Sequence, residues 1–270
     1  MRGVSAEAQA GLLDQVEQAI SAGADLSRIG DDLFAVVAAL DSAPQLRRAL
    51  TDPAAATDQK ADVVRQLFEG KIDSRSLDIV VDAVGRRWSQ PRDLGDALER
   101  AGVEAHAGNA EGEDQLDDTE DELFRFGRLV DNEPQLRDAL TNRLAPEPAK
   151  RDLVRRLLDG KVTEATLHLA TQAVAGRHRS FGTALAEFVR AAAARRERLV
   201  ATARVAQPLD DSTRQRLAEA LSQHYEREIH LNVIVDPDVI GGVRVDIGDE
   251  VIDGTVLNRL QDARRRIAGR

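Results

Sequence analysis

The chain has 270 residues, of which 42% are hydrophobic and 31% charged, and its formal net charge is −10 at pH 7. This composition predicts a folded globular protein, and the length allows one to three domains. The negative charge argues against general nucleic-acid binding as the main role. The sequence has no cysteine, which excludes disulfides and thiolate chemistry. No apolar run approaches the roughly 20 residues that a transmembrane helix needs, so we expect any membrane association to come through a partner.

The first predicted element is a helix at residues 6–21. Leu12, Leu13, Val16 and Ile20 recur at the spacing that places side chains on one face of a helix. This face could pack into an ordinary core or line a groove for a partner helix.

An internal duplication follows. Shifted by 90 residues, segment 31–89 aligns with segment 121–179 without a gap and with 23 of 59 positions identical. Two copies at this spacing predict two similar helical units, because a solenoid would need at least three shorter repeats. His168 and His178 of the second copy align with Asp78 and Trp88 of the first, so the two copies do not keep the same side-chain chemistry at these positions.

Each copy predicts several short helices with recognisable ends. In the first copy a helix should break near Pro44. Gly70 and Gly160 fit the left-handed position after a helix end, and Asp73 and Thr163 are suited to cap the next helix. The last helices are predicted at 92–104 and 181–198. The helix at 6–21 has no obvious counterpart in the second copy.

An acidic segment separates the copies. Residues 108–122 carry eight acidic side chains and no basic one, with glycines at both 108 and 112. We therefore predict a solvated linker at 108–116, which gives a first bundle at 1–107 and a second bundle at 117–198.

Residues 199–270 predict a small α/β domain. A strand at 199–206 precedes a helix at 212–227, and strands at 228–236 and 242–248 flank a Gly-Gly turn. A short strand at 251–253 and a closing helix at 255–267 complete the pattern. The predicted fold class is mainly α, with two tandem related helical bundles followed by a small α/β C-terminal domain.

The segment from Asp236 to Leu260 carries a long motif. It reads Asp-Pro-x-x-x-Gly-Gly-x-x-x-x-x-Gly-Asp-x-x-x-Asp-Gly-Thr-x-x-x-x-Leu, and its characteristic residues are Asp236, Gly241, Gly242, Gly248, Asp249, Asp253 and Gly254. This motif resembles the signature of the delta subunit of rotary ATP synthases, also called the oligomycin-sensitivity-conferring protein. The doubled helical region resembles the long form of this family from actinobacteria.

The resemblance implies a structural role without catalysis. In the family, the helical domain sits on the catalytic head and holds the amphipathic N-terminal helix of the alpha subunit in a groove. The C-terminal domain binds the end of the peripheral stalk, a b-type subunit, so that the stator resists rotor torque during ATP synthesis. The resemblance thus implies a peripheral protein on the cytoplasmic side of the cell membrane, held there by the ATP synthase complex. It also suggests Leu12, Leu13, Val16 and Ile20 as groove residues, because the first helix contributes to that groove in relatives.

Other chemistry has little support in the sequence. Gly241-Gly242 lacks the flanking residues of a phosphate-binding loop and fits a tight turn. One acidic cluster lacks the spacing of a calcium-binding loop: Asp246, Asp249, Glu250 and Asp253. The five histidines also lack metal-ligand spacing: His106, His168, His178, His224 and His230. We therefore predict no catalytic residue, cofactor or metal. The alternative to a stator subunit is a free-standing helical adaptor or regulator.

Overall fold

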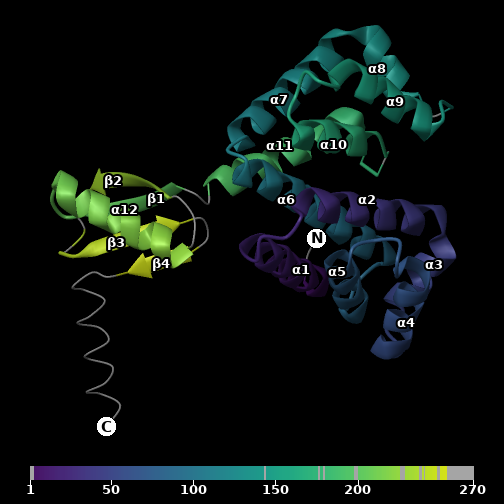
Figure 1. Cartoon of the computed structure of the whole chain (residues 1–270), viewed down its shortest axis with the longest axis horizontal. Helices are drawn as coiled ribbons and strands as arrows, with labels where there is room; N and C mark the ends of the chain where they lie inside the picture. The colour runs from purple at the N-terminus through teal and green to yellow at the C-terminus, as the bar shows by residue number, and fades with distance from the viewer. Residues whose placement is uncertain are drawn as a thin grey trace. The chain divides into compact units, whose positions relative to one another are not determined.

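The computed structural model describes residues 3–253, apart from positions 143, 176, 179, 198–199, 226–228, 237–238, 240 and 248–249. The chain divides into two compact units, Met1–Ala192 and Ala193–Arg270. The first is entirely helical where it is described, and the second contains a small mixed sheet (Figure 1). The predicted mainly α fold with a C-terminal α/β part is confirmed.

The first bundle comprises α1 to α6. Their bounds are α1 Val4–Ser21, α2 Leu26–Ser42, α3 Pro44–Thr51, α4 Thr57–Phe68, α5 Ser74–Gly85 and α6 Pro91–Gly112. The expected break near Pro44 occurs, because proline has no N–H to donate and is tolerated at the first position of α3.

The second bundle comprises α7 to α11. Their bounds are α7 Leu116–Asn132, α8 Pro134–Thr141, α9 Glu147–Leu158, α10 Glu164–Gln172 with the 3-10 turn η1 Ala173–Ala175, and α11 Phe181–Glu197. α8 also begins at a proline, so the two copies use the same device at the same place.

The helix ends predicted from the repeat are confirmed. Gly70 and Gly160 have φ angles of 73° and 67°, the left-handed conformation that glycine adopts without a steric cost. The side chains of Asp73 and Thr163 accept hydrogen bonds from backbone N–H groups in the first turn of α5 and α10. These side chains satisfy donors that have no partner within the helix.

A second shared contact holds each cap in place. The backbone N–H of Asp73 donates to Asp32 Oδ2, and that of Thr163 donates to Glu122 Oε2, both at 2.8 Å. Asp32 in α2 and Glu122 in α7 are separated by the repeat distance of 90 residues. A carboxylate therefore ties α2 to the start of α5 in the first copy, and another ties α7 to the start of α10 in the second.

The predicted linker at 108–116 is wrong, because most of it is helical. α6 continues through Gly112, and Gly108 and Ala110 are buried. The glycine that suggested flexibility is used for packing: a methyl group at Gly108 would lie 2.8 Å from Cδ1 of Ile20 in α1. Only Glu113–Gln115 separate α6 from α7.

α6 serves both bundles. The range 4–21 of α1, shifted by 90 residues, falls at 94–111, within α6. α1 packs against α5, and α6 packs in the same way against α10. The second copy therefore has a counterpart of its first helix, which is the C-terminal part of the last helix of the first bundle.

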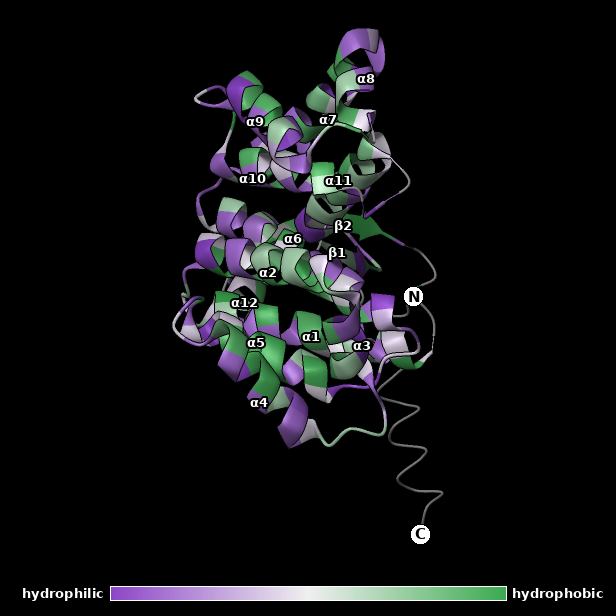
Figure 2. Ribbon diagram, turned by 90° about the vertical axis from the view of Figure 1, so that its right-hand side faces the viewer, coloured by the Kyte–Doolittle hydropathy of each residue, from purple (hydrophilic) through white to green (hydrophobic). Residues whose placement is uncertain are grey.

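Two hydrophobic cores meet along α2 and α6. The first is built from α1 to α6 around Leu33 and Leu98, and the second from the helices of the second bundle around Leu123 and Leu169. Phe34 of α2 and Val103 of α6 belong to the second core. Figure 2 shows apolar residues along the facing sides of α1, α4 and α5. The two bundles therefore share apolar contacts and form one compact unit.

The C-terminal unit is a four-stranded sheet with a helix packed on it. Its elements are β1 Val200–Val205, α12 Asp211–Tyr225, β2 His230–Val235, β3 Val243–Ile247 and β4 Glu250–Asp253. The strand order is β2-β1-β3-β4, with β1 parallel to β2 and antiparallel to β3, and β3 antiparallel to β4. Alternate residues such as Ala201, Ala203, Val245 and Ile247 form the core under α12, with Leu221 of that helix. The predicted closing helix at 255–267 lies outside the described residues.

The predicted Gly-Gly turn lies between two strands that are not neighbours in the sheet. Gly241 and Gly242 do turn the chain, with φ angles of 66° and 84°, but they do not join paired strands. β1 lies between β2 and β3, so this segment carries the chain across β1. The physical reason is that β1 offers a hydrogen-bonding edge to each of these strands, which local sequence cannot reveal.

Candidate functional site

The signature residues that the structure describes lie at the ends of β2, β3 and β4. Asp236 directly follows β2, and its backbone N–H donates to the carbonyl of Val205 at 2.9 Å. Gly241 and Gly242 precede β3, and Asp253 ends β4, paired in register with Arg244. The structure thus gives this part of the motif a place in the sheet. Gly248, Asp249 and Gly254 lie outside the described residues.

Two acidic side chains of this segment are hydrogen-bonded to other side chains of the same chain. Asp246 accepts hydrogen bonds from Arg204 and Arg244, each at 3.2 Å, and Glu250 accepts one from the hydroxyl of Tyr225 at 2.8 Å. Although burial by itself would raise the pKa of Asp246, these two arginines hold it below its ordinary value. The pairing agrees with a structural role for these carboxylates.

The edge strands of the sheet expose apolar side chains. Val251 and Ile252 of β4 are 50% and 38% exposed, and Ile234 and Val235 of β2 are 39% and 48% exposed. Exposed strand edges and apolar side chains are features that partner proteins use.

The predicted groove residues of α1 differ in exposure. Leu12 and Val16 are fully buried in the first core, whereas Leu13 and Ile20 are half-buried at its edge. A partner groove along α1 stays a prediction, and only Leu13 and Ile20 keep surface that a partner could contact.

A more open apolar groove lies between α7 and α11. It has a volume of about 330 Å³ and is lined by apolar side chains with a few charges at its rim. Phe124 is 56% exposed there, and Gly127 and Gly182 leave space between the helices. Arg128 and Arg190 bring positive charge to its lining, and Asp131 brings one negative charge. The sequence did not predict this groove. The repeat aligns Phe124 with Phe34, but the alignment does not show that one ring is exposed and the other buried.

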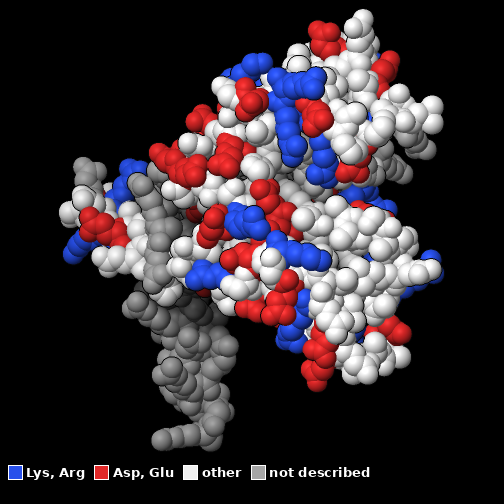
Figure 3. Space-filling model, turned by 45° about the vertical axis from the view of Figure 1, so that its right-hand side comes forward, with Lys and Arg blue, Asp and Glu red and all other residues white. Residues whose placement is uncertain are grey.

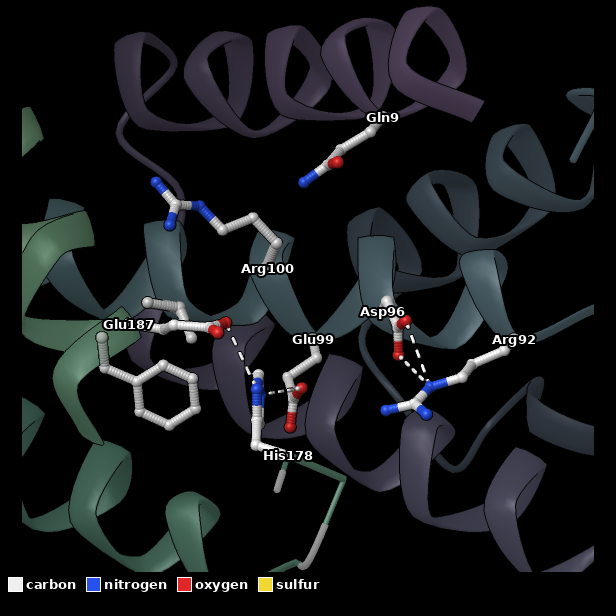
Figure 4. Close-up of a pocket in the computed structure, with 9 residues that line it drawn as sticks. Gln9, Arg92, Asp96, Glu99, Arg100, His178 and Glu187 are labelled. Carbon is white, nitrogen blue, oxygen red and sulfur yellow. Dashed lines mark hydrogen bonds and ion pairs between the residues drawn. The ribbon is translucent and has the colours of Figure 1, made fainter. Parts of the chain in front are cut away.

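A polar pocket of about 370 Å³ lies where α1, α6 and α11 meet. Figure 4 shows His178 between the carboxylates of Glu99 and Glu187, at 3.1 Å and 3.2 Å, with Arg92 beside Asp96. The charged side chains of this pocket therefore lie next to groups of opposite sign.

Arg177 is the centre of this polar cluster. Its side chain is 5% exposed, and its guanidinium contacts Asp41 and Asp96, with Glu99 Oε2 at 3.3 Å. The side-chain amide of Gln172 donates to Glu99 at 2.8 Å. These contacts join residues of α2 and α6 to residues of the second bundle, so their role is to hold the two bundles together.

The pKa values follow these contacts. Burial alone would raise the pKa of Glu99, but hydrogen bonds from His178 and Gln172 and the charge of Arg177 hold it below its ordinary value. The hydrogen bond to Glu99 raises the pKa of His178. The protonated form of His178 and the ionised form of Glu99 therefore stabilise each other.

A second polar cluster joins the bundles at Asp31, His106 and His168. These residues belong to α2, α6 and α10, and their possible ligand atoms all lie within 4.8 Å of one another. The two imidazole rings are stacked, with centroids 4.8 Å apart and an interplanar angle of 20°. Sequence spacing could not indicate this group, because its members lie far apart in the chain and meet only through packing.

One face of the molecule carries charged side chains of both signs. The face shown in Figure 3 intersperses acidic and basic side chains. Nucleic-acid binding would require a concentration of basic residues along one surface.

Comparison with known proteins identifies relatives along the whole chain. Residues 103–267 match the family model described as ATP synthase delta (OSCP) subunit. ATP synthase subunit delta of Streptomyces avermitilis is 46% identical over 268 residues, which cover 98% of both chains. The protein of the same name from Thermobifida fusca is 43% identical over 270 residues and all of both chains, and that from Kineococcus radiotolerans is 48% identical over 248 residues, 92% of this chain and 90% of its relative.

The matches also locate the additional bundle. The family model begins within α6, where the 90-residue shift places the counterpart of α1. The full-length matches include the additional bundle, which confirms the long actinobacterial form. Among the described residues, each helix is too short or too polar to cross a membrane. The chain therefore belongs to the ATP synthase delta (OSCP) subunit family, which supplies a structural, non-catalytic subunit to the ATP synthase.

Proposed function

We propose that this chain is the stator link of a rotary ATP synthase. Its helical unit binds the N-terminal helix of the alpha subunit on the catalytic head, and its C-terminal unit binds the end of the b-type peripheral stalk. The complex holds the protein at the cytoplasmic side of the cell membrane as a peripheral subunit. The observation that carries this proposal is the near-complete match to delta subunits together with the division into two units.

The two-unit construction supports a link between two partners. Each unit has its own hydrophobic core, so each can bind one partner without lending core residues to the other. A stator transmits force through its contacts, and packed cores resist deformation. A free-standing adaptor would not require the signature that continues into β3 and β4.

We assign the alpha-subunit helix to the groove between α7 and α11. An amphipathic helix binds such a groove through apolar residues at positions i, i+3, i+4 and i+7. Phe124 and Val189 supply apolar surface, while Arg128 and Arg190 favour acidic residues along the edge of the partner helix. The α1 face offers less, because Leu12 and Val16 are already buried.

We assign the stalk to the edge of the sheet at β4. Val251 and Ile252 are exposed on this edge strand, next to the last described residue of the signature. A helical stalk end would bury these apolar side chains, and removing their surface from water would favour binding.

The test is a pair of calorimetric titrations of the full chain with the alpha-subunit N-terminal peptide and with the soluble part of the stalk subunit. Phe124→Asp should weaken peptide binding at least tenfold and leave stalk binding unchanged. Ile252→Asp should do the reverse. Leu144→Asp is the matched control, since Leu144 is 93% exposed and lies outside both surfaces.

The titrations distinguish a wrongly assigned groove from a wrong function. Loss of peptide binding in Ile20→Asp but not in Phe124→Asp would move the groove to α1. If the wild-type chain bound neither partner, also after the two partners were supplied together, the stator proposal would be wrong.

A further inference from the structure

The joint between the two bundles contains a buried nitrogen that no side chain satisfies. His106 is 1% exposed, and its Nε2 has no hydrogen-bond partner. The nearest carboxylate oxygen is Asp31 Oδ1, at 3.5 Å. Buried polar atoms are nearly always paired, so an unpaired ring nitrogen facing a carboxylate indicates a missing ligand.

The ring of His106 is held in one place by its neighbours. It lies 5.3 Å from the ring of Phe34 and stacks on His168. On α2 it contacts the backbone at Gly30, where a methyl group would lie 2.4 Å from Nε2.

His168 completes the set of donor atoms. Its Nδ1 lies 2.6 Å from the same oxygen of Asp31, and its Nε2 lies 3.5 Å from Glu164 Oε1. When one ring nitrogen of a histidine binds a metal, the other commonly donates its proton to a carboxylate, and this contact orients the ring. Glu164 is placed for that role, and Ser27 Oγ donates to it at 3.5 Å.

We propose that Asp31, His106 and His168 form a Zn²⁺ site that bridges the two helical bundles. Two imidazole nitrogens and one carboxylate oxygen are a donor set that suits Zn²⁺, whereas Ca²⁺ and Mg²⁺ prefer oxygen alone. The sequence contains no cysteine that could compete for the ion. Asp31 belongs to the first bundle, His106 to the shared helix and His168 to the second bundle, so one ion would connect all three.

The three donor atoms lie within 4.8 Å of one another, so forming the site requires them to draw together by at most about 1.5 Å. Ligand atoms in a tetrahedral zinc site with bonds of about 2.0 Å lie about 3.3 Å apart. The His106–Asp31 separation of 3.5 Å is close to this value, and the His168–Asp31 contact of 2.6 Å must lengthen by less than about 1 Å. Asp31 and His168 also line a pocket of about 260 Å³, which provides an entry path and room for water as the fourth ligand.

The ion would change how firmly the bundles are joined. Without it, the joint here consists of a partly exposed ion pair between Asp31 and His168 and the buried ring of His106. With it, three ligands on three helices are fixed to one centre. We therefore expect Zn²⁺ to stabilise the helical unit against thermal unfolding and to leave the C-terminal unit unaffected.

The experiment is calorimetric titration of the full chain with ZnCl₂ after removal of metal by a chelator. The wild-type chain should bind one ion. The variants Asp31→Asn and His168→Ala should each bind at least about 100-fold more weakly, and Glu164→Gln about tenfold more weakly, because outer partners of a ligand contribute less than the ligand. His224→Ala is the matched control, because His224 is exposed on α12 in the other unit.

A second measurement does not depend on the variants. Co²⁺ added to the wild-type chain should give the visible absorption of a four-coordinate site with nitrogen and oxygen ligands, and Zn²⁺ should abolish it. The proposal is wrong if the wild-type chain binds no Zn²⁺, or if Asp31→Asn and His168→Ala, shown by circular dichroism to be folded, bind it as the wild-type chain does.

Discussion

Phe34 and Phe124 occupy the same position in the two copies and have opposite environments. Phe34 is 7% exposed and belongs to the core of the second bundle, whereas Phe124 is 56% exposed beside the groove between α7 and α11. In the first bundle, α6 and the helices of the second bundle cover this face. In the second bundle, the described helices leave the corresponding face open.

This difference shows how a duplication can create a binding surface. When two units pack head to tail, the face that the first uses to hold the second is repeated on the second and remains uncovered. A similar partner, an amphipathic helix, is the natural occupant. The repeat therefore supplies both the joint inside the helical unit and the groove that we assign to the alpha subunit.

The largest difference between the copies should appear at Arg177 and its equivalent Arg87. Arg177→Met should lower the free energy of unfolding by about 3–5 kcal/mol, because Glu99 would lose its buried counter-charge. Arg87 is exposed, so Arg87→Met should change it by less than about 0.5 kcal/mol. Urea unfolding followed by circular dichroism measures both. Equal effects would show that the cluster does not hold the bundles together.

The next largest difference concerns the two phenylalanines. Phe34→Ala should cost about 3 kcal/mol of unfolding free energy, because it removes a side chain that fills the contact between the bundles. Phe124→Ala should cost less than about 1 kcal/mol in the isolated chain, since its ring is already more than half exposed. If the groove is the alpha-subunit site, adding the peptide should stabilise the wild-type chain more than Phe124→Ala. The same denaturant titrations, with and without peptide, give both values.

Removing the helix caps should cost the two copies a similar free energy of unfolding. Asp73→Ala and Thr163→Ala should each lower the unfolding free energy by about 1 kcal/mol, because each removes an acceptor for backbone N–H groups at a helix start. Similar values from chemical unfolding would confirm that the copies share local structure. A loss confined to one copy would mean that packing alone holds the other helix.

The smallest effect is a pH dependence present in only one copy. The hydrogen bond to Glu99 raises the pKa of His178 in the folded chain, so its contribution to stability is complete below the unfolded value of about 6.5. It is lost as the pH rises through the higher folded value. Glu99 and Glu187 contact His178, Asp96 adds negative charge nearby, and Arg177 also contacts Glu99. Melting temperatures measured from pH 6 to pH 9 should fall less in His178→Asn than in the wild-type chain.

Trp88 is the natural control for that prediction. It replaces His178 in the first copy, and its indole N–H donates to the carbonyl of Ala83 at 2.8 Å. Trp88→Phe should leave the pH dependence unchanged, because indole does not titrate in this range. An equal loss of pH dependence in both variants would show that another group is responsible.

Sequence by itself determined the local structure of this protein. Proline at the start of α3 and α8, left-handed glycines at 70 and 160, and the caps Asp73 and Thr163 act within a few residues of the chain. The alternation of strands β1 and β3 and the family signature are also local patterns. Such features depend on backbone geometry and near neighbours, so they can be predicted without knowing the fold.

Only the tertiary structure decided how the copies are joined and which surfaces remain open. Gly108 indicates a linker by composition, yet it lets α6 pack closely on Ile20. Asp31, His106 and His168 come together because three helices converge, and Phe34 differs from Phe124 because a neighbouring bundle covers one of them. Burial and contact depend on residues far apart in the chain, and two copies with the same local pattern acquire different surroundings when one packs against the other.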